Sequence, residues 1–232
     1  IPFRKELLER KINLITELKK KQAVPVHILD QVSRNLPEFM WLDSLTANAN
    51  AINIVDGFNG LASKTASLAF LGYAVMAQSM GDGQLAGLSL ILGACVWGFF
   101  WVNWPLGKIF LGDGGSYFVG FALAWVAVML LDRNESVSAF AVLLVCVHPV
   151  IEVVFSIYRR KIKRAHPGHP DRLHFHSLVK QRYVRRWFPS LSTGLRNSIT
   201  GLMMGGMTLT AALIACLTQD SVVLSLLAFV GL

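Results

Sequence analysis

The sequence predicts an all-α fold, a polytopic membrane helix bundle with about five to six transmembrane helices. Of the 232 residues, 53% are hydrophobic and only 16% are charged, whereas average soluble domains carry about 25% charged residues. Several long stretches lack any charge, and crossing the hydrocarbon core takes roughly 17–25 mostly apolar residues. A soluble all-α protein with wholly buried helices is the alternative that these stretches disfavour.

The uncharged stretches give the predicted spans in chain order. They are 65–81, 83–107, 114–131, 136–158 with Glu152 as its one charge, 197–219 and 221–232. Residues 1–47 form a polar and basic segment of unclear structure, and we expect a membrane-embedded domain over 48–232. Because the chain begins at Ile1 and its last apolar run stops after twelve residues, we expect a fragment or a processed chain.

The charge distribution predicts the orientation of these spans. Residues 159–196 hold eleven of the 22 Lys and Arg residues against one acidic residue, Asp171. Because loops rich in Lys and Arg stay in the cytoplasm, we expect the basic loop 159–198 on that side. The alternative is that its charge only rests on anionic lipid headgroups. We expect no nucleic-acid partner, because this basic patch lies beside a bilayer without interleaved aromatic residues.

Two predicted hairpins, each turning on the outer side, return two further polar segments to the cytoplasmic surface. Three segments rich in Gly, Asn or His should therefore share that surface: 48–64, 103–116 and 166–177. The outer loops, by contrast, are short. This asymmetry predicts an active site at the cytoplasmic membrane interface.

Asp113 stands in a glycine-rich stretch before a predicted span, in the sequence Gly112-Asp113-Gly114-Gly115-Ser116. Flanking glycines let the backbone approach a ligand closely, and Ser116 would cap a helix whose free N–H groups suit a phosphate. A carboxylate beside a phosphate needs a hard cation between them, and Mg²⁺ is held by one or two carboxylates plus phosphate oxygens. The pattern predicts Asp113 as a metal ligand, with simple capping of a membrane helix as the alternative.

Four carboxamides and one carboxylate lie within twelve residues of the segment 48–64. They are Asn48, Asn50, Asn53, Asp56 and Asn59. The pairs Asp56-Gly57 and Asn59-Gly60 predict that a turn interrupts a helix there. Amides pair well with a nucleobase edge, a ribose or an acetamido group, so we interpret the segment as a ligand site. Polar contacts between membrane helices are the alternative, which accounts for one Asn better than for all of them.

Histidines are the mark of the segment 166–177. His174 and His176 alternate around Phe175, and Asp171-Arg172 precede them. Imidazolium and guanidinium groups beside the membrane fit diphosphate binding. A zinc site of three or four ligands is the alternative, and its candidates are His166, His169, His174 and His176. In the preceding span, Glu152 is an ionisable intramembrane residue and therefore a functional candidate.

Together the three segments resemble the polyprenyl-phosphate N-acetylhexosamine-1-phosphate transferases, also called glycosyltransferase family 4. The family motif N-x-x-N-x-x-D-G-x-[DN]-G-L matches the residues from Asn50 to Leu61. The motif N-x-x-P…F-x-G-D-x-G-S matches those from Asn103 to Ser116. The signature P-D-x-x-H-x-H of the GlcNAc-type branch matches residues 170–176. The likeness covers roughly residues 48–232.

The resemblance implies catalytic roles for Asp56, Asp113, His174 and His176. Asp113 would hold Mg²⁺, with Mn²⁺ as a second candidate. Phe110 would stack on uracil, and the two histidines would contact the diphosphate and the sugar. The remaining implied substrate contacts are Asn50, Asn53, Asn59, Asn103, Asp171 and Arg172.

The implied reaction transfers N-acetylhexosamine-1-phosphate, expected to be GlcNAc-1-phosphate, from a UDP-sugar to undecaprenyl phosphate with release of UMP. It would begin a cell-surface polysaccharide, O-antigen-like or of the cell wall, at the cytoplasmic face of a bacterial plasma membrane. A homodimer is compatible with this reading. A phospho-MurNAc-pentapeptide transferase is the alternative within the family, although its loop usually bears consecutive histidines. A small transporter would place charges near the bilayer midplane and fits less well.

The sequence also departs from the family pattern. It contains no adjacent pair of aspartates, which family members carry on an early cytoplasmic loop, and Ser177 stands where a further histidine often follows. Residues 36–47 are too short and too charged for the apolar helix expected before the asparagine motif. We therefore expect the N-terminal spans of the family to be missing, and a non-catalytic C-terminal fragment is an alternative reading of the chain.

Overall fold

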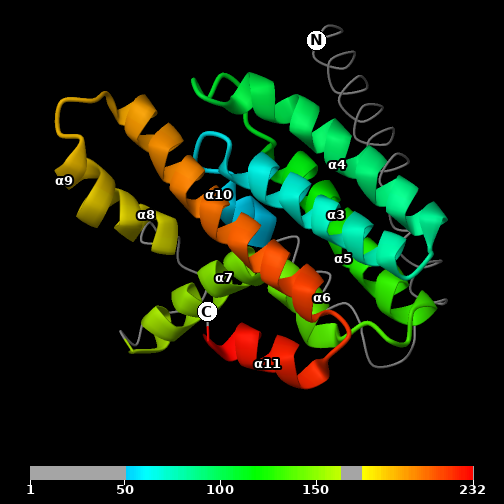
Figure 1. Cartoon of the computed structure of the whole chain (residues 1–232). Helices are drawn as coiled ribbons and strands as arrows, with labels where there is room; N and C mark the ends of the chain where they lie inside the picture. Colours follow the sequence, from blue (N-terminus) through cyan, green and yellow to red (C-terminus); the bar gives the residue numbers. More distant parts are fainter. Residues whose placement is uncertain (1–50, 163–173, 232) are drawn as a thin grey trace, which may run out of the picture. The chain divides into compact units, whose positions relative to one another are not determined.

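The computed structural model describes residues 51–162 and 174–231, and this part of the chain is helical with no β-strand (Figure 1). The predicted all-α class is therefore confirmed. The helices are α3 (Leu61–Ser79), α4 (Gly83–Asn103), α5 (Gly112–Arg133), α6 (Ala139–Val145), α7 (Val147–Ile162), α8 (Phe175–Val179), the π-helical η1 (Lys180–Val184), α9 (Arg185–Trp187), α10 (Thr193–Thr218) and α11 (Val222–Gly231). The predicted segment 1–47 lies outside the described residues.

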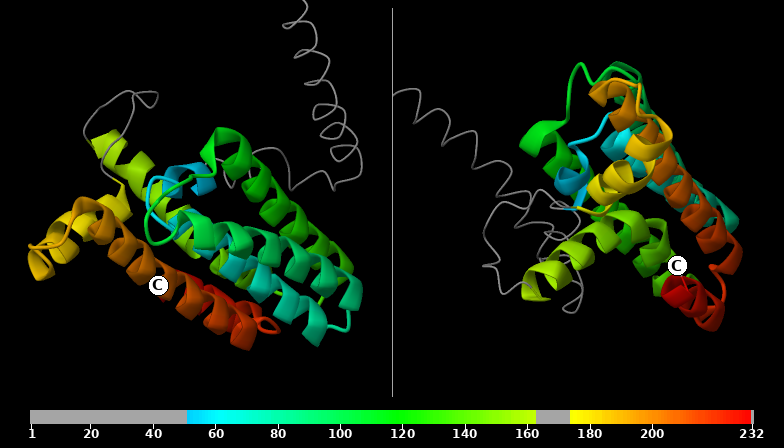
Figure 2. Two further views of the ribbon diagram at one scale, coloured as in Figure 1. Left: turned by 90° about the horizontal axis from the view of Figure 1, so that it is seen from above. Right: turned by 90° about the vertical axis from the view of Figure 1, so that its left-hand side faces the viewer.

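Helix α3 occupies the centre of the bundle. It packs against α4, α5, α6 and α10, and Figures 1 and 2 show α10 running alongside it. The buried side chains of Phe70, Tyr73 and Met76 belong to one apolar core cluster that also takes in residues of α4, α5, α6 and α10. Because α3 is surrounded by other helices, it can carry Ser63, Lys64 and Thr65 as buried polar residues.

The described residues form fewer membrane spans than the five or six predicted. The helices α4, α5 and α10 are long and apolar enough to cross a membrane, and the bent pair of α6 and α7 would make a fourth span. The predicted span 221–232 forms α11, which is only ten residues long. Residues 65–79 of the predicted span 65–81 belong to α3, whose polar first turns are buried against its neighbours.

The predicted continuous span 136–158 is broken, which corrects that expectation. Helices α6 and α7 meet at Cys146 with a bend of 81°. Pro149 lies in the first turn of α7, where a proline is tolerated because its missing N–H would have no helical partner. In a continuous helix, the same proline would remove a hydrogen bond and clash with the preceding turn. The sequence therefore favours a new helix start over an unbroken span.

The turns between the helices collect at two ends of the bundle. At one end, the Ser138 N–H donates to the Gln219 carbonyl at 2.8 Å, the Gln219 amide donates to Ser79 at 2.8 Å, and Arg133 pairs with Asp82 at 3.0 Å. The opposite end carries the turn at 56–60, the connection 104–111 and the start of α10. Of the three polar segments predicted to gather, the described parts of the first two, 51–64 and 103–116, therefore lie at one end of the bundle.

Candidate active site

Asp56 joins the asparagine segment to the start of α5. Residues 51–55 are helical, and a turn over 56–60 follows, as the Asp-Gly and Asn-Gly pairs predict. Gly60 closes this turn with a φ of +72°, a left-handed conformation that favours glycine. The Asp56 carboxylate accepts hydrogen bonds from the backbone N–H of Leu111 at 3.2 Å and of Gly112 at 2.8 Å. Two motifs far apart in the sequence are thus held together by one side chain.

Ser116 does not cap α5, which corrects the sequence prediction: Leu111 is the N-cap residue, and the Asp56 carboxylate accepts hydrogen bonds from the N–H groups of Leu111 and Gly112. Helix α5 begins at Gly112, so Ser116 lies one turn inside it. Its hydroxyl donates to the Gly112 carbonyl at 2.6 Å, and the hydroxyl oxygen also lies 3.2 Å from the Asn53 side-chain oxygen. Burial raises the pKa of Asp56 above its usual value, although the bonds from Gly112 and Leu111 oppose that shift.

Asn59 and Asn103 are buried and hold the loops of the site in place. The Asn59 amide donates to the Pro105 carbonyl at 2.8 Å and to the Ser198 hydroxyl at 3.1 Å. The Asn103 side-chain oxygen accepts from the Gly60 N–H, and its amide donates to the Ile109 carbonyl at 2.5 Å. In this conformation the amide nitrogens of both residues donate hydrogen bonds to other groups of the protein. Both residues therefore hold the loops of the site in position. Ser198, which the sequence analysis did not single out, is part of the same network.

Asp113 and Phe110 are, by contrast, open to their surroundings. Asp113 is exposed in the first turn of α5, where a negative charge interacts favourably with the helix dipole. The Phe110 side chain is 41% exposed. Asn53 is half-buried between them and the turn. Together with the half-buried His174, these are the predicted ligand-contacting side chains that a molecule approaching the described part of the site could reach.

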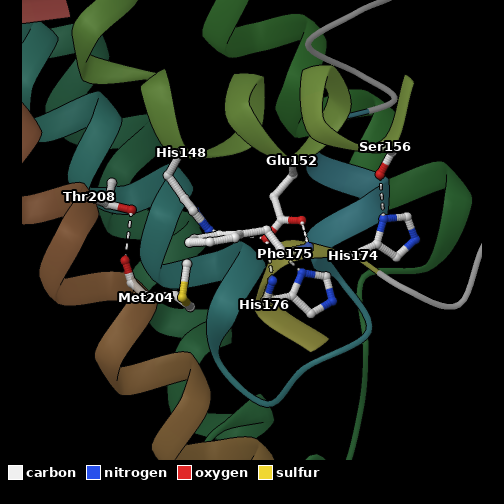
Figure 3. Close-up of polar contacts among 8 residues, drawn as sticks. All are labelled: His148, Glu152, Ser156, His174, Phe175, His176, Met204 and Thr208. Atoms are coloured by element: carbon white, nitrogen blue, oxygen red, sulfur yellow. Dashed lines mark hydrogen bonds and ion pairs between the residues drawn. The ribbon is translucent and has the colours of Figure 1, made fainter. Parts of the chain in front are cut away.

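The H-x-H pair is held by α7. The His174 ring nitrogen Nδ1 lies 3.0 Å from the Ser156 hydroxyl, and His176 Nδ1 lies 2.9 Å from the Glu152 carboxylate (Figure 3). The two imidazole rings stack with centroids 5.5 Å apart. His176 also meets the Phe58 ring edge-on at 4.5 Å. Since Phe58 belongs to the turn that contains Asp56, this contact connects the histidine segment to the other two.

Lys180 is a cation of the site that sequence reasoning missed. Its ammonium group lies 5.3 Å from the centroid of the Phe58 ring, a cation–π distance. Burial lowers the pKa of Lys180, and the nearby positive charge of Arg196 lowers it further. Nothing in the spacing of the basic loop distinguishes Lys180 from its neighbours. Its position depends on η1 packing against α10.

The remaining predicted residues fall outside the described chain. These are Asn50, Asp171 and Arg172, together with His166 and His169 of the alternative zinc site. Within residues 51–162 and 174–231, no group of three or more His, Cys, Asp or Glu residues is arranged to hold a metal ion. A metal at Asp113 would therefore need further ligands from a bound molecule or from water, as Mg²⁺ in phosphate-binding sites commonly has.

Comparisons with known proteins point to one family. Residues 26–131 match the family described as "Glycosyl transferase family 4". The chain is 34% identical over 140 residues to the "Probable undecaprenyl-phosphate N-acetylglucosaminyl 1-phosphate transferase" of Bacillus subtilis, covering 59% of this chain and 38% of that protein. It is 29% identical over 178 residues to the "Undecaprenyl-phosphate alpha-N-acetylglucosaminyl 1-phosphate transferase" of Salmonella typhi, covering 75% and 47%.

A third relative carries the same description. The Escherichia coli K12 protein is 30% identical over 146 residues, covering 61% of this chain and 40% of its own length. The chain thus matches less than half the length of each of these relatives. The matched family range starts upstream of residue 48, where the sequence analysis began the likeness, and ends before the H-x-H pair. It contains both the asparagine motif and the Asp113 motif, and over residues 26–131 the resemblance to glycosyl transferase family 4 is confirmed.

Proposed function

We propose that this chain takes part in the transfer of N-acetylglucosamine-1-phosphate from a UDP-sugar to undecaprenyl phosphate, with release of UMP. The observation that carries the proposal is the convergence of three motif segments at one end of an apolar helix bundle. Asp56 ties the first segment to the second, and the contact between Phe58 and His176 ties the first to the third. The relatives named above act, by their descriptions, on undecaprenyl phosphate.

In this reaction, an oxygen of the lipid phosphate attacks the β-phosphorus of the UDP-sugar. The bond from that phosphorus to the bridging oxygen breaks, and the bridging oxygen leaves with UMP. Phosphoryl-type transfer depends mainly on alignment of the attacking oxygen and on stabilisation of charge. Among the described residues, Lys180 beside Phe58 and the half-exposed His174 offer side chains suited to the diphosphate. His176 is 2% exposed and would act through its stacking contact with His174.

We assign Phe110 to the uracil ring and Asp113 to a divalent cation, Mg²⁺ or Mn²⁺. An exposed aromatic side chain can stack on a base, and the exposed Asp113 carboxylate offers one hard oxygen ligand. When bound, the cation would offset the negative charge of the diphosphate. Asn59 and Asn103 take positioning roles in this proposal, because both are buried and bonded to backbone carbonyl groups.

The GlcNAc branch is favoured over the phospho-MurNAc-pentapeptide branch. All the relatives compared above are described as N-acetylglucosaminyl 1-phosphate transferases, and the H-x-H spacing agrees with that branch. The proposed location is a bacterial plasma membrane with the site on the cytoplasmic face, which the basic composition of residues 159–196 supports.

The test is an exchange assay in membranes that contain the chain. Radiolabelled UMP should be incorporated into UDP-GlcNAc when undecaprenyl phosphate and Mg²⁺ are present, and chelation of the metal should abolish incorporation. Asp113→Asn should lower the rate by at least about 100-fold, because it removes a metal ligand that stabilises the transferring group. Asp132→Asn is the matched control, since Asp132 is also an exposed aspartate of α5 but lies in its last turn.

Two results would contradict the proposal. Exchange that persists unchanged in the presence of a chelator would remove the assigned role of Asp113. A chain that exchanges UMP with UDP-MurNAc-pentapeptide but not with UDP-GlcNAc would place the protein in the other branch.

A further inference from the structure

Glu152 is the most completely enclosed acidic residue among the described residues. It lies in the second turn of α7 and has an exposed fraction of 0%. Isolated charges are costly to bury, and buried carboxylates are therefore paired or hydrogen-bonded. Among the described residues, the partners of Glu152 come from α7 itself and from the H-x-H segment.

Among the described residues, two backbone N–H groups and two imidazole nitrogens lie around this carboxylate (Figure 3). One oxygen accepts the backbone N–H of Phe175 at 2.8 Å. The other accepts the backbone N–H of His176 at 2.9 Å and lies 2.9 Å from the His176 ring nitrogen Nδ1. The ring nitrogen Nε2 of His148 lies 3.6 Å from the same oxygen. The main chain and the side chain of His176 are thus fixed by one group.

The spacing along α7 explains how one helix serves both histidines. His148, Glu152 and Ser156 follow one another at intervals of four residues and therefore lie on one face of α7. Glu152 holds His176, and Ser156 holds His174 one turn further along. The 5.5 Å separation of the two imidazole rings matches the pitch of an α-helix, about 5.4 Å. Successive turns of α7 therefore hold the two imidazole rings about one helical pitch apart.

We propose that Glu152 is the positioning residue of the H-x-H pair, and that the α7 face formed by His148, Glu152 and Ser156 sets the placement of both imidazoles. The consequence for catalysis rests on the proposed function, in which His174 contacts the diphosphate and His176 acts through its stacking contact with His174. The placement itself does not depend on that function. An ionised carboxylate is needed because it only accepts hydrogen bonds. The amide of a glutamine would turn a donor toward at least one of the backbone N–H groups.

The first experiment measures placement without catalysis. The purified full chain is treated with diethyl pyrocarbonate, which acylates accessible imidazole nitrogens, and each histidine is followed by mass spectrometry. His176 should react slowly in the wild type because it is 2% exposed. Glu152→Gln should raise the His176 rate by roughly tenfold or more, because fewer bonds resist local opening. Glu152→Asp, which keeps the charge on a shorter side chain, should fall between the two.

Two controls separate positioning from general loosening. Ser156→Ala removes one partner of His174 on the same face and should leave His176 protected. Glu135→Gln changes an exposed glutamate at the opposite end of the bundle and should change neither histidine. Helix content, measured by circular dichroism, should be equal in all variants. If Glu152→Gln does not fold, Glu152→Asp carries the comparison.

The second experiment asks whether Glu152 acts through His176. In the exchange assay, Glu152→Gln should lower kcat/KM by up to about 100-fold, because small displacements of a reacting group have effects of that size. His176→Gln should have a similar effect. The double variant should lose no more than roughly threefold beyond His176→Gln alone, since residues that act as one unit are not additive. Independent, multiplicative losses would contradict the proposal.

The two experiments distinguish failure of the positioning role from failure of the proposed function. A His176 labelling rate that Glu152→Gln leaves unchanged overturns the positioning role, even if exchange activity is present. Loss of His176 protection in a chain that shows no exchange with UDP-GlcNAc supports the positioning role and counts against the proposed function.

Discussion

Single side chains, rather than long interfaces, connect the polar segments of this protein. Asp56 receives two backbone N–H groups of another segment, Asn103 bonds to Gly60 and Ile109, and Glu152 holds the H-x-H pair. Each of these residues has a small polar group in a buried position. Because unpaired buried polar groups cost free energy, replacement of one partner should disturb the segment that it holds.

Asp56→Ala should destabilise the fold. Two charge-assisted hydrogen bonds to the start of α5 are lost, and their worth is partly offset because the buried carboxylate no longer has to be desolvated. We expect the free energy of unfolding to fall by about 2 kcal/mol. In a chain of this size, the melting temperature in detergent should drop by roughly 4–8 °C. Asp132→Ala, at an exposed position of α5, should shift it by no more than about 2 °C; a drop equal to that of Asp56→Ala would contradict this account.

Replacement by alanine should lower the free energy of unfolding at Gly107 and raise it at Gly98. Gly107 has a φ of +62°, and an added Cβ would contact the side-chain oxygen of Asn59. Gly107→Ala should therefore cost about 1–3 kcal/mol through strain and displacement of Asn59. Gly98 lies inside α4 with no atom within 4 Å of an added Cβ. Gly98→Ala should stabilise the helix by roughly 0.5–1 kcal/mol. Denaturant unfolding of the two variants in detergent provides the comparison, and equal signs would refute it.

At the scale of elements, α3 and α10 depend on the absence of side chains at particular glycines. An alanine Cβ at Gly201 would lie 2.5 Å from the backbone oxygen of Asn59, and one at Gly205 would collide with the Lys64 side chain. Lys64 itself donates to the Gly201 carbonyl at 3.3 Å. Close approach of membrane helices through small residues is common. Here it also makes room for a buried lysine stem.

Adjacent glycines of α10 provide a matched test of this packing. Gly205→Ala should destabilise the bundle by about 1–3 kcal/mol, the usual cost of overpacking a filled interior. Gly206 is exposed, and an added Cβ there meets no atom within 4 Å. Gly206→Ala should be neutral or slightly stabilising because alanine favours the helix. The melting temperatures of the two variants, measured by thermal unfolding, provide the comparison. A Gly205→Ala variant as stable as Gly206→Ala would mean that α10 does not pack on Lys64.

At the scale of the whole molecule, sequence patterns predicted which segments lie close together. They predicted few of the side-chain contacts that hold these segments together. Uncharged stretches predicted α4, α5 and α10, and the Asp-Gly and Asn-Gly pairs predicted the turn over 56–60. The break between α6 and α7 was missed, because the length of the apolar run was given more weight than Pro149, which favours a new helix start. The hydrogen bonds of Asp56 and Glu152 to other segments were missed for another reason. The partners in those segments lie at least 55 residues from Asp56 and at least 23 residues from Glu152, and local periodicity carries no information on such pairs.

The orientation of the bundle is the prediction that belongs to the molecule as a whole. Two exposed residues lie toward opposite ends of the helix bundle. Arg186 belongs to α9, at the end that carries the site. Glu135 belongs to the loop after α5, at the other end. Each is replaced by cysteine in a background that carries Cys95→Ser, and intact cells are treated with a membrane-impermeant maleimide. Glu135→Cys should be labelled from outside, and Arg186→Cys only after the membrane is permeabilised, because the Lys- and Arg-rich loop should remain in the cytoplasm. The basic loop would then share its side with cytoplasmic nucleotide sugars, as the proposed reaction requires. Labelling of Arg186→Cys in intact cells would place the H-x-H pair on the wrong side of the membrane for that reaction.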